Sequence, residues 1–400
     1  MIYIILGGVN MKNNWFNKVT KLAAVGAVGL ILAACGNETE GGGASGSTVP
    51  GDDSSMKLGL ITAQTGGASA YGISIEEGAQ LAVDEINEAN PEHQIEFIIE
   101  DEKGQKDEAI NAMNKLIHQD QVLAVQGPML TGTMNAGGPV AQEAGVVSLG
   151  TSTTGEGITG IGDFVFRNAV PESTAVVEAT KQAHEELDFD SAAILYSQNN
   201  DQMVSVNSTL EDTFEELGVE VVASETFADG DTDYSAQLTN IQSADPDVIA
   251  VASLLQEGSV IMSAARDMGL EQPVIGSNGF NSPAFIEQSG PAADGAIVGI
   301  PWFPGRESDI TQDFNEAYDA EYGKNADQFA AQSYDGIHML YQAWEDTGYT
   351  QDRVEFRDAL ADISDFEGVT GSVSFDENRD PVAEVRVLKV EDGEFVPLAE

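Results

Sequence analysis

The chain has 400 residues, enough for two or three domains, and its hydrophobic content of 42% can support full cores. Its 17 Lys and Arg residues face 67 Asp and Glu residues, so a surface with a net charge of -50 repels nucleic acid and disfavours a polyphosphate ligand. The single cysteine, Cys35, excludes an intramolecular disulfide and a metal site built on several cysteines. The acidity favours a strongly solvated surface, as in a saline or alkaline medium, over a specific cationic partner.

The first predicted element is a secretory signal. Three lysines after Met11 precede an apolar run, 22–34, that is too short to span a bilayer comfortably. The run ends in the letters LAAC, which resemble the lipobox of bacterial lipoproteins, with Cys35 as the modified residue. We predict that 1–35 is a lipoprotein signal peptide, that translation starts at Met11, and that cleavage leaves a lipid-bearing Cys35 as the first residue.

The next segment, 36–55, is rich in Gly, Ser and acidic residues and shows no apolar periodicity. This composition is typical of a flexible linker. We therefore expect a folded body that is tethered to the outer face of the cytoplasmic membrane by lipid. One acyl chain anchors a protein only marginally, whereas two or more hold it stably.

From residue 56 on, short apolar runs alternate with amphipathic segments of helical period. The runs predict strands at 57–62, 94–100, 122–127, 145–150, 191–196, 219–227, 247–253, 273–277 and 295–300. The amphipathic segments predict helices at 73–89, 106–119, 132–144, 173–187, 202–217, 234–244 and 258–269. The rhythm restarts after Pro171, so the alternation predicts an α/β protein with two lobes, each built on a doubly wound parallel sheet.

The last hundred residues follow a different pattern. After Trp302 the periodicity predicts three helices, at Asp309–Tyr322, Gln328–Trp344 and Arg353–Ala361. The chain then ends in extended patterns between 368 and 396.

The loops after the predicted strands carry the chemistry, because ligands of open α/β sheets bind beyond the carboxyl ends of the strands. These loops are rich in Gly, Ser, Thr, Asn and Gln and poor in Lys, Arg and His. They offer hydroxyl, amide and backbone N–H groups, which suit a small polar or zwitterionic ligand better than acid–base chemistry. The chain also has no P-loop and no G-x-S-x-G elbow, and its four histidines are far apart. We expect no catalysis, no metal and no cofactor.

Six segments of the body occur in a characteristic order: TAQTGGASAYGISIEEGAQLAVDEIN, GPMLTG, AGVVSLGTSTT, AARDMGL, GSNGFNSPAF and GVTGSVSFDENRDPV. With them, the chain from Met56 to about Phe395 resembles the leucine/isoleucine/valine-binding type of ABC-transporter substrate-binding proteins. The resemblance implies the type I periplasmic-binding fold, in which three crossovers join two lobes that close on a ligand. It assigns 56–171 and 302–381 to lobe 1, and 172–301 and 382–400 to lobe 2.

The resemblance also implies how the ligand is held in the first lobe. There, hydroxyl and N–H donors bind the ligand's carboxylate, and the matching positions are Thr131, Ser152, Thr153 and Thr154. Such donors can bind a carboxylate without a formal cation. Tyr71 matches an aromatic residue that lines the pocket.

In the second lobe the chain departs from the family pattern. Gln202, preceded by Asp201, stands where the family often has a tyrosine, and Leu254 replaces a second aromatic residue. The acid that meets the ligand's ammonium falls at Asn278, and an amide cannot supply that charge. Either Asp201 supplies it instead, or the ligand has no α-ammonium.

These patterns predict an extracytoplasmic solute-binding protein of an ABC importer that closes on a branched-chain amino acid or a similar small carboxylate or amide. The expected partners are the small-molecule solute, the ABC permease and, through the lipid anchor, the membrane. We expect no nucleic-acid partner, and we expect a monomer. A receptor-like sensor of the same fold is the alternative, and an extracellular enzyme is a more distant one.

Overall fold

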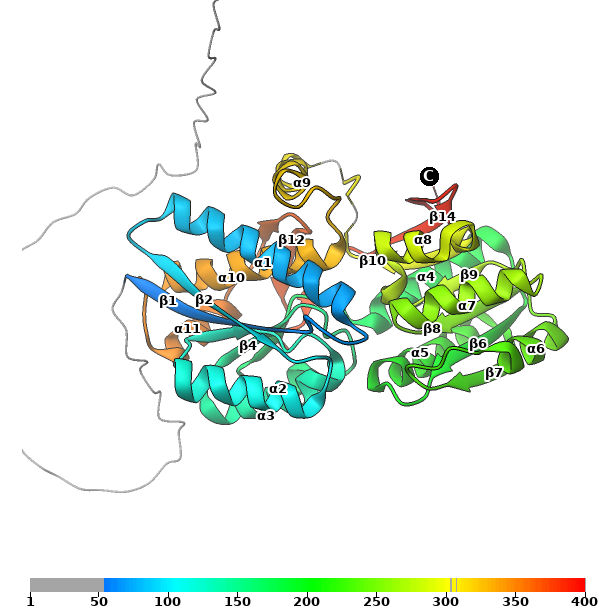
Figure 1. Ribbon diagram of the computed structural model, residues 1–400, viewed down its shortest axis with the longest axis horizontal. Coiled ribbons are helices and arrows are strands. Elements are labelled where there is room, and N and C mark those ends of the chain that lie inside the picture. The colour runs from blue at the N-terminus through cyan, green and yellow to red at the C-terminus, as the bar shows by residue number, and fades with distance from the viewer. Residues whose placement is uncertain (1–53, 303, 307, 400) are drawn as a thin grey trace, which may run out of the picture. The chain divides into compact units, whose positions relative to one another are not determined.

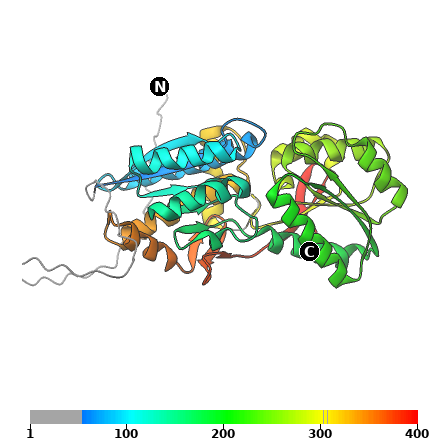
Figure 2. The ribbon, with the colours of Figure 1, turned by 90° about the horizontal axis from the view of Figure 1, so that it is seen from below.

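The computed structural model describes residues 54–302, 304–306 and 308–399, which belong to one compact unit of the chain. The predicted signal peptide, Cys35 and most of the predicted linker lie outside these residues. The described part is an α/β protein with two separate parallel sheets that are covered by helices (Figures 1 and 2). This arrangement confirms the predicted fold class. No helix in the described part is both long and apolar enough to cross a membrane.

The first sheet has five parallel strands in the order β2-β1-β3-β4-β5. These strands are β1 (Ser55–Thr62), β2 (Gln94–Asp101), β3 (Ala124–Gln126), β4 (Val147–Gly150) and β5 (Val165–Arg167). The connecting helices are α1 (Ser69–Ala89), α2 (Lys106–Lys115), which continues as a π-helical turn over Leu116–Asp120, and α3 (Thr131–Ala144). Each helix returns the chain to the same end of the sheet, which makes neighbouring strands parallel.

The second sheet repeats this order and extends it. Its order is β15-β14-β10-β9-β8-β6-β7. The five strands from β6 to β10 are parallel, β14 pairs antiparallel with β10, and β15 pairs antiparallel with β14. The strands are β6 (Ser191–Ser197), β7 (Glu220–Phe227), β8 (Val248–Ala252), β9 (Val274–Gly276), β10 (Ala296–Ile300), β14 (Arg386–Glu391) and β15 (Glu394–Pro397). The helices are α4 (Glu172–Leu187), α5 (Asp201–Leu217), α6 (Ser235–Ala244), α7 (Leu255–Asp267) and α8 (Pro283–Ser289).

The C-terminal segment adds three helices and a small antiparallel sheet. The helices are α9 (Asp309–Tyr322), α10 (Gln328–Asp346) and α11 (Arg353–Ala361), and each begins at the residue predicted for it. The sheet joins β11 (Phe366–Gly368), β12 (Gly371–Phe375) and β13 (Pro381–Val382). Helix α10 packs along α1, and Gly78 allows this approach because a Cβ atom there would lie 2.1 Å from the carbonyl oxygen of Ala330.

The strands of the parallel sheets are apolar on both faces because helices cover both faces. In β8, Val248 and Ala250 pack into the cluster formed by α4 and α5, whereas Ile249 and Val251 pack into the cluster that contains residues of α6 and α7. This two-sided burial explains why the sequence shows continuous apolar runs at the strands rather than an alternating pattern.

We call β1–β5, α1–α3, α9–α11 and the small sheet the first lobe, and β6–β10, α4–α8, β14 and β15 the second lobe. The chain passes from one to the other after β5, after β10 and after β13. The exact lobe boundaries given by the sequence, at 171, 301 and 381, stay a prediction.

A buried carboxylate fastens the small sheet to α10. Asp335 accepts hydrogen bonds from the backbone N–H of Val369 (2.8 Å), the backbone N–H of Thr370 (2.8 Å) and the Thr370 hydroxyl (2.5 Å). Burial raises the pKa of Asp335 to about 6, although these donors act in the opposite direction.

We predict that Asp335 makes the stability of the protein depend on pH. The pKa of Asp335 is about 6 in the folded protein, whereas its ordinary value is 3.8. The stabilising contribution of Asp335 to the free energy of unfolding is therefore fully present below pH 3.8 and is lost as the pH rises through about 6. From pH 7 to pH 5, the free energy of unfolding of the wild type should therefore rise relative to that of Asp335→Asn, as measured by urea denaturation. A difference between the two proteins that stays constant over this range would contradict the assignment.

Candidate functional site

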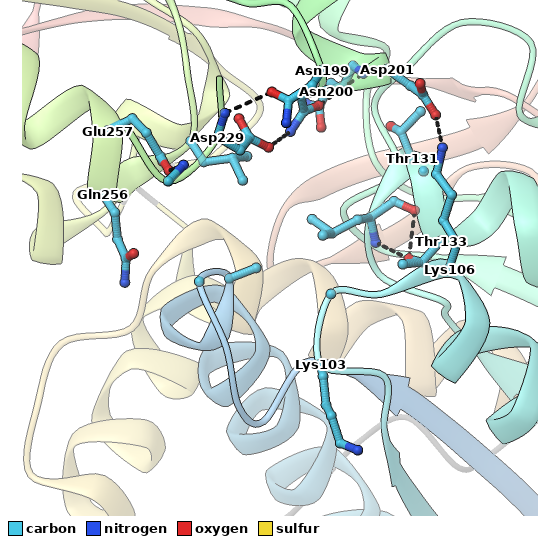
Figure 3. Close-up of a pocket in the computed structure, with 18 residues that line it drawn as sticks. Lys103, Lys106, Thr131, Thr133, Asn199, Asn200, Asp201, Asp229, Gln256 and Glu257 are labelled. Atoms are coloured by element: carbon cyan, nitrogen blue, oxygen red, sulfur yellow. Dashed lines mark hydrogen bonds and ion pairs between the residues drawn. The ribbon is translucent and has the colours of Figure 1, made fainter. Parts of the chain in front are cut away.

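Loops that follow strands of the first sheet meet loops that follow strands of the second, and a cavity of ≈ 340 Å³ lies between them (Figure 3). The first lobe contributes Gly67, Ala68, Lys103, Gly104, Lys106, Leu130, Thr131, Gly132 and Thr133 to its wall. The second lobe contributes Asn199, Asn200, Asp201, Gln202, Asp229, Gly230, Leu254, Gln256 and Glu257. Both lobes must therefore be in place for this cavity to exist.

The structure separates the predicted ligand-binding residues into two groups. The residues that line the cavity are Thr131, Asp201, Gln202 and Leu254. The residues that are buried but do not line it are Tyr71, Ser152, Thr153, Thr154 and Asn278. Of the second group, Thr154 forms a hydrogen bond with Gln202 of the cavity wall, and Tyr71 forms one with Leu255, which lies between Leu254 and Gln256 of the wall.

A buried carboxylate connects members of both groups. Glu172, the first residue of α4, is only 3% exposed. Its Oε2 accepts hydrogen bonds from Thr154 Oγ1 (3.1 Å) and Gln202 Nε2 (3.2 Å), and its Oε1 accepts one from the backbone N–H of Asn278 (2.7 Å). Glu172 thus joins the first lobe, through Thr154, to the second.

The charge of Glu172 has no cationic partner in the part of the chain that the structure describes. Burial raises the pKa of Glu172, and the three hydrogen bonds from neutral donors lower it. A buried charge that is stabilised by neutral donors alone is costly to the folded protein. The site is therefore suited to receive a positive charge.

The two positions singled out from the sequence for this acid both have partners within the protein. Asp201 is exposed, and its Oδ2 lies 2.7 Å from Lys106 Nζ in an ion pair between the lobes. Asn278 presents its backbone N–H to Glu172, and its side-chain oxygen accepts a hydrogen bond from Gln328 of α10. Glu172 follows Pro171 at the start of a helix, where a glutamate is common because it faces the positive end of the helix dipole, so the sequence did not distinguish it.

Tyr71 forms a contact between the lobes. Its hydroxyl oxygen accepts a hydrogen bond from the backbone N–H of Leu255, the first residue of α7, and its ring packs against Phe329 with centroids 4.7 Å apart. Burial raises the pKa of Tyr71, so the phenol stays neutral. Tyr71 therefore holds the lobes together beside the cavity.

The loop between β4 and β5 is held by a buried arginine that the sequence analysis did not single out. Arg167 is 1% exposed, and its Nη1 donates to the carbonyl oxygens of Thr153 (3.0 Å) and Gly155 (2.6 Å). Its Nε lies 2.6 Å from Asp380 Oδ1. The backbone N–H of Gly155 in turn donates to Thr131 Oγ1 at 3.0 Å. This network fixes the loop against the N-terminus of α3.

The same loop carries buried hydroxyl groups that lack partners. Thr151 Oγ1 and Thr153 Oγ1 are buried and form no hydrogen bond with any described residue. Buried polar groups in proteins are nearly always paired, so such atoms call for an explanation such as a ligand or an ordered water. Within the described residues there is no group of three or more His, Cys, Asp or Glu side chains that could hold a metal ion.

Comparison with known proteins supports this description of the fold. Residues 55–394 match the model of a family described as periplasmic binding protein. The Leu/Ile/Val-binding protein BraC3 of Rhizobium johnstonii is 27% identical over 353 residues, which cover 85% of this chain and 93% of that protein.

Solved structures give the same result. The branched-chain amino acid transporter substrate-binding protein LivJ of Streptococcus pneumoniae, in complex with isoleucine, is 31% identical, with a TM-score of 0.81 over 85% of this chain and 97% of that chain. A solute-binding protein of an ABC transporter from Rhodopseudomonas palustris, in complex with 3,4-dihydroxybenzoic acid, is 24% identical, with a TM-score of 0.80 over 86% of this chain and 95% of that chain. The second likeness bears on the fold alone.

We predict that Arg167→Ala lowers the free energy of unfolding by about 3 kcal/mol, because removal of one partner of a buried ion pair leaves the other groups unpaired. Urea denaturation measures the loss, and hydrogen exchange of the amides in 151–160 should become faster. Arg386→Ala, which removes an arginine whose side chain is 44% exposed, is the matched control and should change stability by less than about 0.5 kcal/mol. Equal effects of the two substitutions would contradict the role of Arg167.

Proposed function

The chain belongs to the periplasmic binding protein family, and we propose that it is the solute-binding protein of an ABC importer. In this proposal the two lobes capture a small solute outside the cytoplasmic membrane and present it to a membrane permease. Only a form that closes around the solute is recognised, so binding energy has to favour the closed form. No covalent chemistry is required, and we propose that the protein is not an enzyme.

The observation that carries the proposal is the buried, unpaired carboxylate of Glu172 beside a loop of hydroxyl groups. We propose that the solute is amino-acid-like, with its ammonium at Glu172. The amide of Gln202 now donates to Glu172, and an ammonium in its place would give a charge-assisted hydrogen bond of greater strength. Glu172 thus takes the role that the sequence analysis sought at Asn278 or Asp201.

The carboxylate of the solute has its donors on the first lobe. The hydroxyl groups of Thr151 and Thr153 are buried without partners, and Thr131 stands at the N-terminus of α3, where backbone N–H groups favour an anion. Ser152 and Thr154 belong to the same loop and complete this side of the proposed site. Arg167 does not take part in binding in this proposal but holds the loop in position by donating hydrogen bonds to two of its carbonyl oxygens.

The contact between Tyr71 and Leu255 belongs to closure in this proposal. A bond between a side chain of the first lobe and the backbone of the second exists only when the lobes are together, and the same holds for the pair formed by Lys106 and Asp201. Such contacts lower the free energy of the closed form, and a solute that touches both lobes adds to them.

The remaining assignments are proposals of the same kind. Cys35 carries the lipid, the mature protein is anchored to the outer face of the cytoplasmic membrane, and it acts as a monomer. The solute-binding residues are those predicted from the sequence together with Glu172 and Thr151.

A thermal-shift screen over amino acids, amides and carboxylates tests the proposed function. A solute that binds only the folded protein raises its apparent stability, by about 2.7 kcal/mol at a concentration of 100 Kd. We expect amino acids to raise the melting temperature of the wild type. A screen in which no amino acid and no other carboxylate or amide gives a shift would refute the proposal.

The variant Glu172→Gln tests the role of the buried acid. We expect at least a tenfold loss of affinity for amino acids in titration calorimetry, because the ligand's ammonium loses its counter-charge. Glu178→Gln, an exposed position on the same helix, is the matched control. Unchanged affinity in Glu172→Gln would remove the acid from the site.

The lipid anchor is tested by Cys35→Ser. We expect the variant to appear in the soluble fraction or to remain unprocessed, because the serine cannot accept the lipid. Fractionation of cells that express either form measures this. A variant that stays with the membrane and is processed like the wild type would refute the anchor.

A further inference from the structure

The cavity beside Thr131 has walls of opposite charge. The first lobe contributes Lys103 and Lys106, two of only 17 basic residues in the chain. The second lobe contributes Asp229 and Glu257 together with Asp201 (Figure 3). This charge separation is unexpected in a pocket for an aliphatic side chain.

Both lysines already have acidic partners. Lys103 Nζ lies 3.0 Å from Glu108 Oε1, and Lys106 Nζ lies 2.7 Å from Asp201 Oδ2. Figure 3 shows the side chain of Lys106 directed toward Asp201. The positive wall is therefore neutralised within the protein, and Asp201 is neutralised with it.

The other two carboxylates are not neutralised. Asp229 accepts hydrogen bonds from the Ser197 hydroxyl (2.5 Å) and from Asn200 Nδ2 (2.9 Å), and Glu257 accepts one from the backbone N–H of Gly230 (3.0 Å). All of these donors are neutral. Within the described ranges neither carboxylate forms an ion pair with Lys, Arg or His.

Burial distinguishes Glu257 from a solvated surface carboxylate. Glu257 is only 9% exposed and borders the cavity, whereas Asp229 is half-buried. The charges of Glu257 and Asp229 both act on the buried Tyr234, whose pKa is raised chiefly by burial and further by these neighbours. The two carboxylates thus lie in one region of uncompensated negative potential.

An aliphatic ligand would fit this wall poorly. The side chains of Ala68, Leu130 and Leu254 are the apolar ones among the cavity-lining residues, and the rest of the wall is polar, charged or glycine. A leucine-like side chain would displace water from Asp229 and Glu257 without replacing its hydrogen bonds, which is unfavourable. A cationic side chain would pair with them instead.

We infer that the solute is a basic amino acid or a close analogue, whose distal ammonium or guanidinium group binds between Asp229 and Glu257. This inference rests on the proposed function, because Thr131 and Gln202, which belongs to the proposed site through its hydrogen bond to Glu172, line the same cavity as Asp229 and Glu257. The volume of ≈ 340 Å³ is at the lower end of the range for small-molecule pockets and suits a solute of this size. A guanidinium group would present paired N–H donors that match a carboxylate in geometry.

The charge of the whole chain favours the same class of solute. A net charge of -50 attracts small cations at long range and repels anions. This attraction is screened by salt, whereas the contacts inside the cavity are screened much less. The preference for a cationic side chain should therefore persist at high ionic strength.

Titration calorimetry with matched ligand pairs tests the inference. Arginine is compared with citrulline and lysine with norleucine, since each pair has similar shape and differs in side-chain charge, and leucine is included. We expect arginine or lysine to bind at least tenfold more tightly than its neutral counterpart at both 0.1 M and 1 M NaCl. Preference for the neutral member, or equal affinity within each pair, would overturn the inference and leave the proposed function standing. If no amino acid, carboxylate or amide binds, both the inference and the proposed function fail.

The double variant Asp229→Asn and Glu257→Gln tests whether these two residues cause the preference for a cationic side chain. We expect the ratio of arginine to citrulline affinity to fall toward one. The matched control, Glu211→Gln with Asp212→Asn, removes two exposed carboxylates from α5 and should keep the ratio of the wild type. A ratio that falls equally in both variants would show that the overall charge, not this pair, selects the solute, and would overturn the assignment of the two residues.

Discussion

The structure depends on a carboxyl group that is buried where the two lobes meet. Glu172 is held by Thr154 of the first lobe and by Gln202 and Asn278 of the second, and all three are neutral donors. A carboxylate in this position is tolerated only while these donors surround it, so the lobes stay together at a cost. In the proposed function, a cation that enters the site lowers this cost and favours the closed form, so that binding and closure are two effects of one electrostatic constraint.

The positive charges of the chain are placed where they neutralise specific acids. Lys106 pairs with Asp201 across the two lobes, and Arg167 pairs with Asp380 behind the loop that carries Thr153. Among the carboxylates without an ion pair, Glu172 in the interior and Asp229 and Glu257 at the cavity are the ones that lie next to the proposed solute. In our proposal, the distribution of charge therefore indicates the class of solute more closely than the shape of the cavity does.

The fold was predictable from local patterns. The helix at Arg353–Ala361 and the start of the helix at Gln328 coincide with the prediction, because helical periodicity is visible in the sequence. In the structure, the side chains of Asp327 and Asp352 cap these helices. The parallel sheets followed from the alternation of strands and helices. The β strands near the C-terminus were visible only as extended patterns. The pairing of β14 with β10, for example, joins residues far apart in the chain.

The sequence by itself determined the fold class, the family resemblance and the chemical character of the loops, because these depend on residues that are neighbours in the chain. Only the tertiary structure decided which charges are buried and which are paired. In the sequence, Glu172 has the pattern of an ordinary first residue of a helix, yet its hydrogen-bond partner Asn278 is 106 positions away. Tyr71 and its partner Leu255 are 184 positions apart. Burial and ion pairing arise when distant segments meet, so no local pattern can reveal that Glu172 is enclosed or that Asp201 is already neutralised by Lys106.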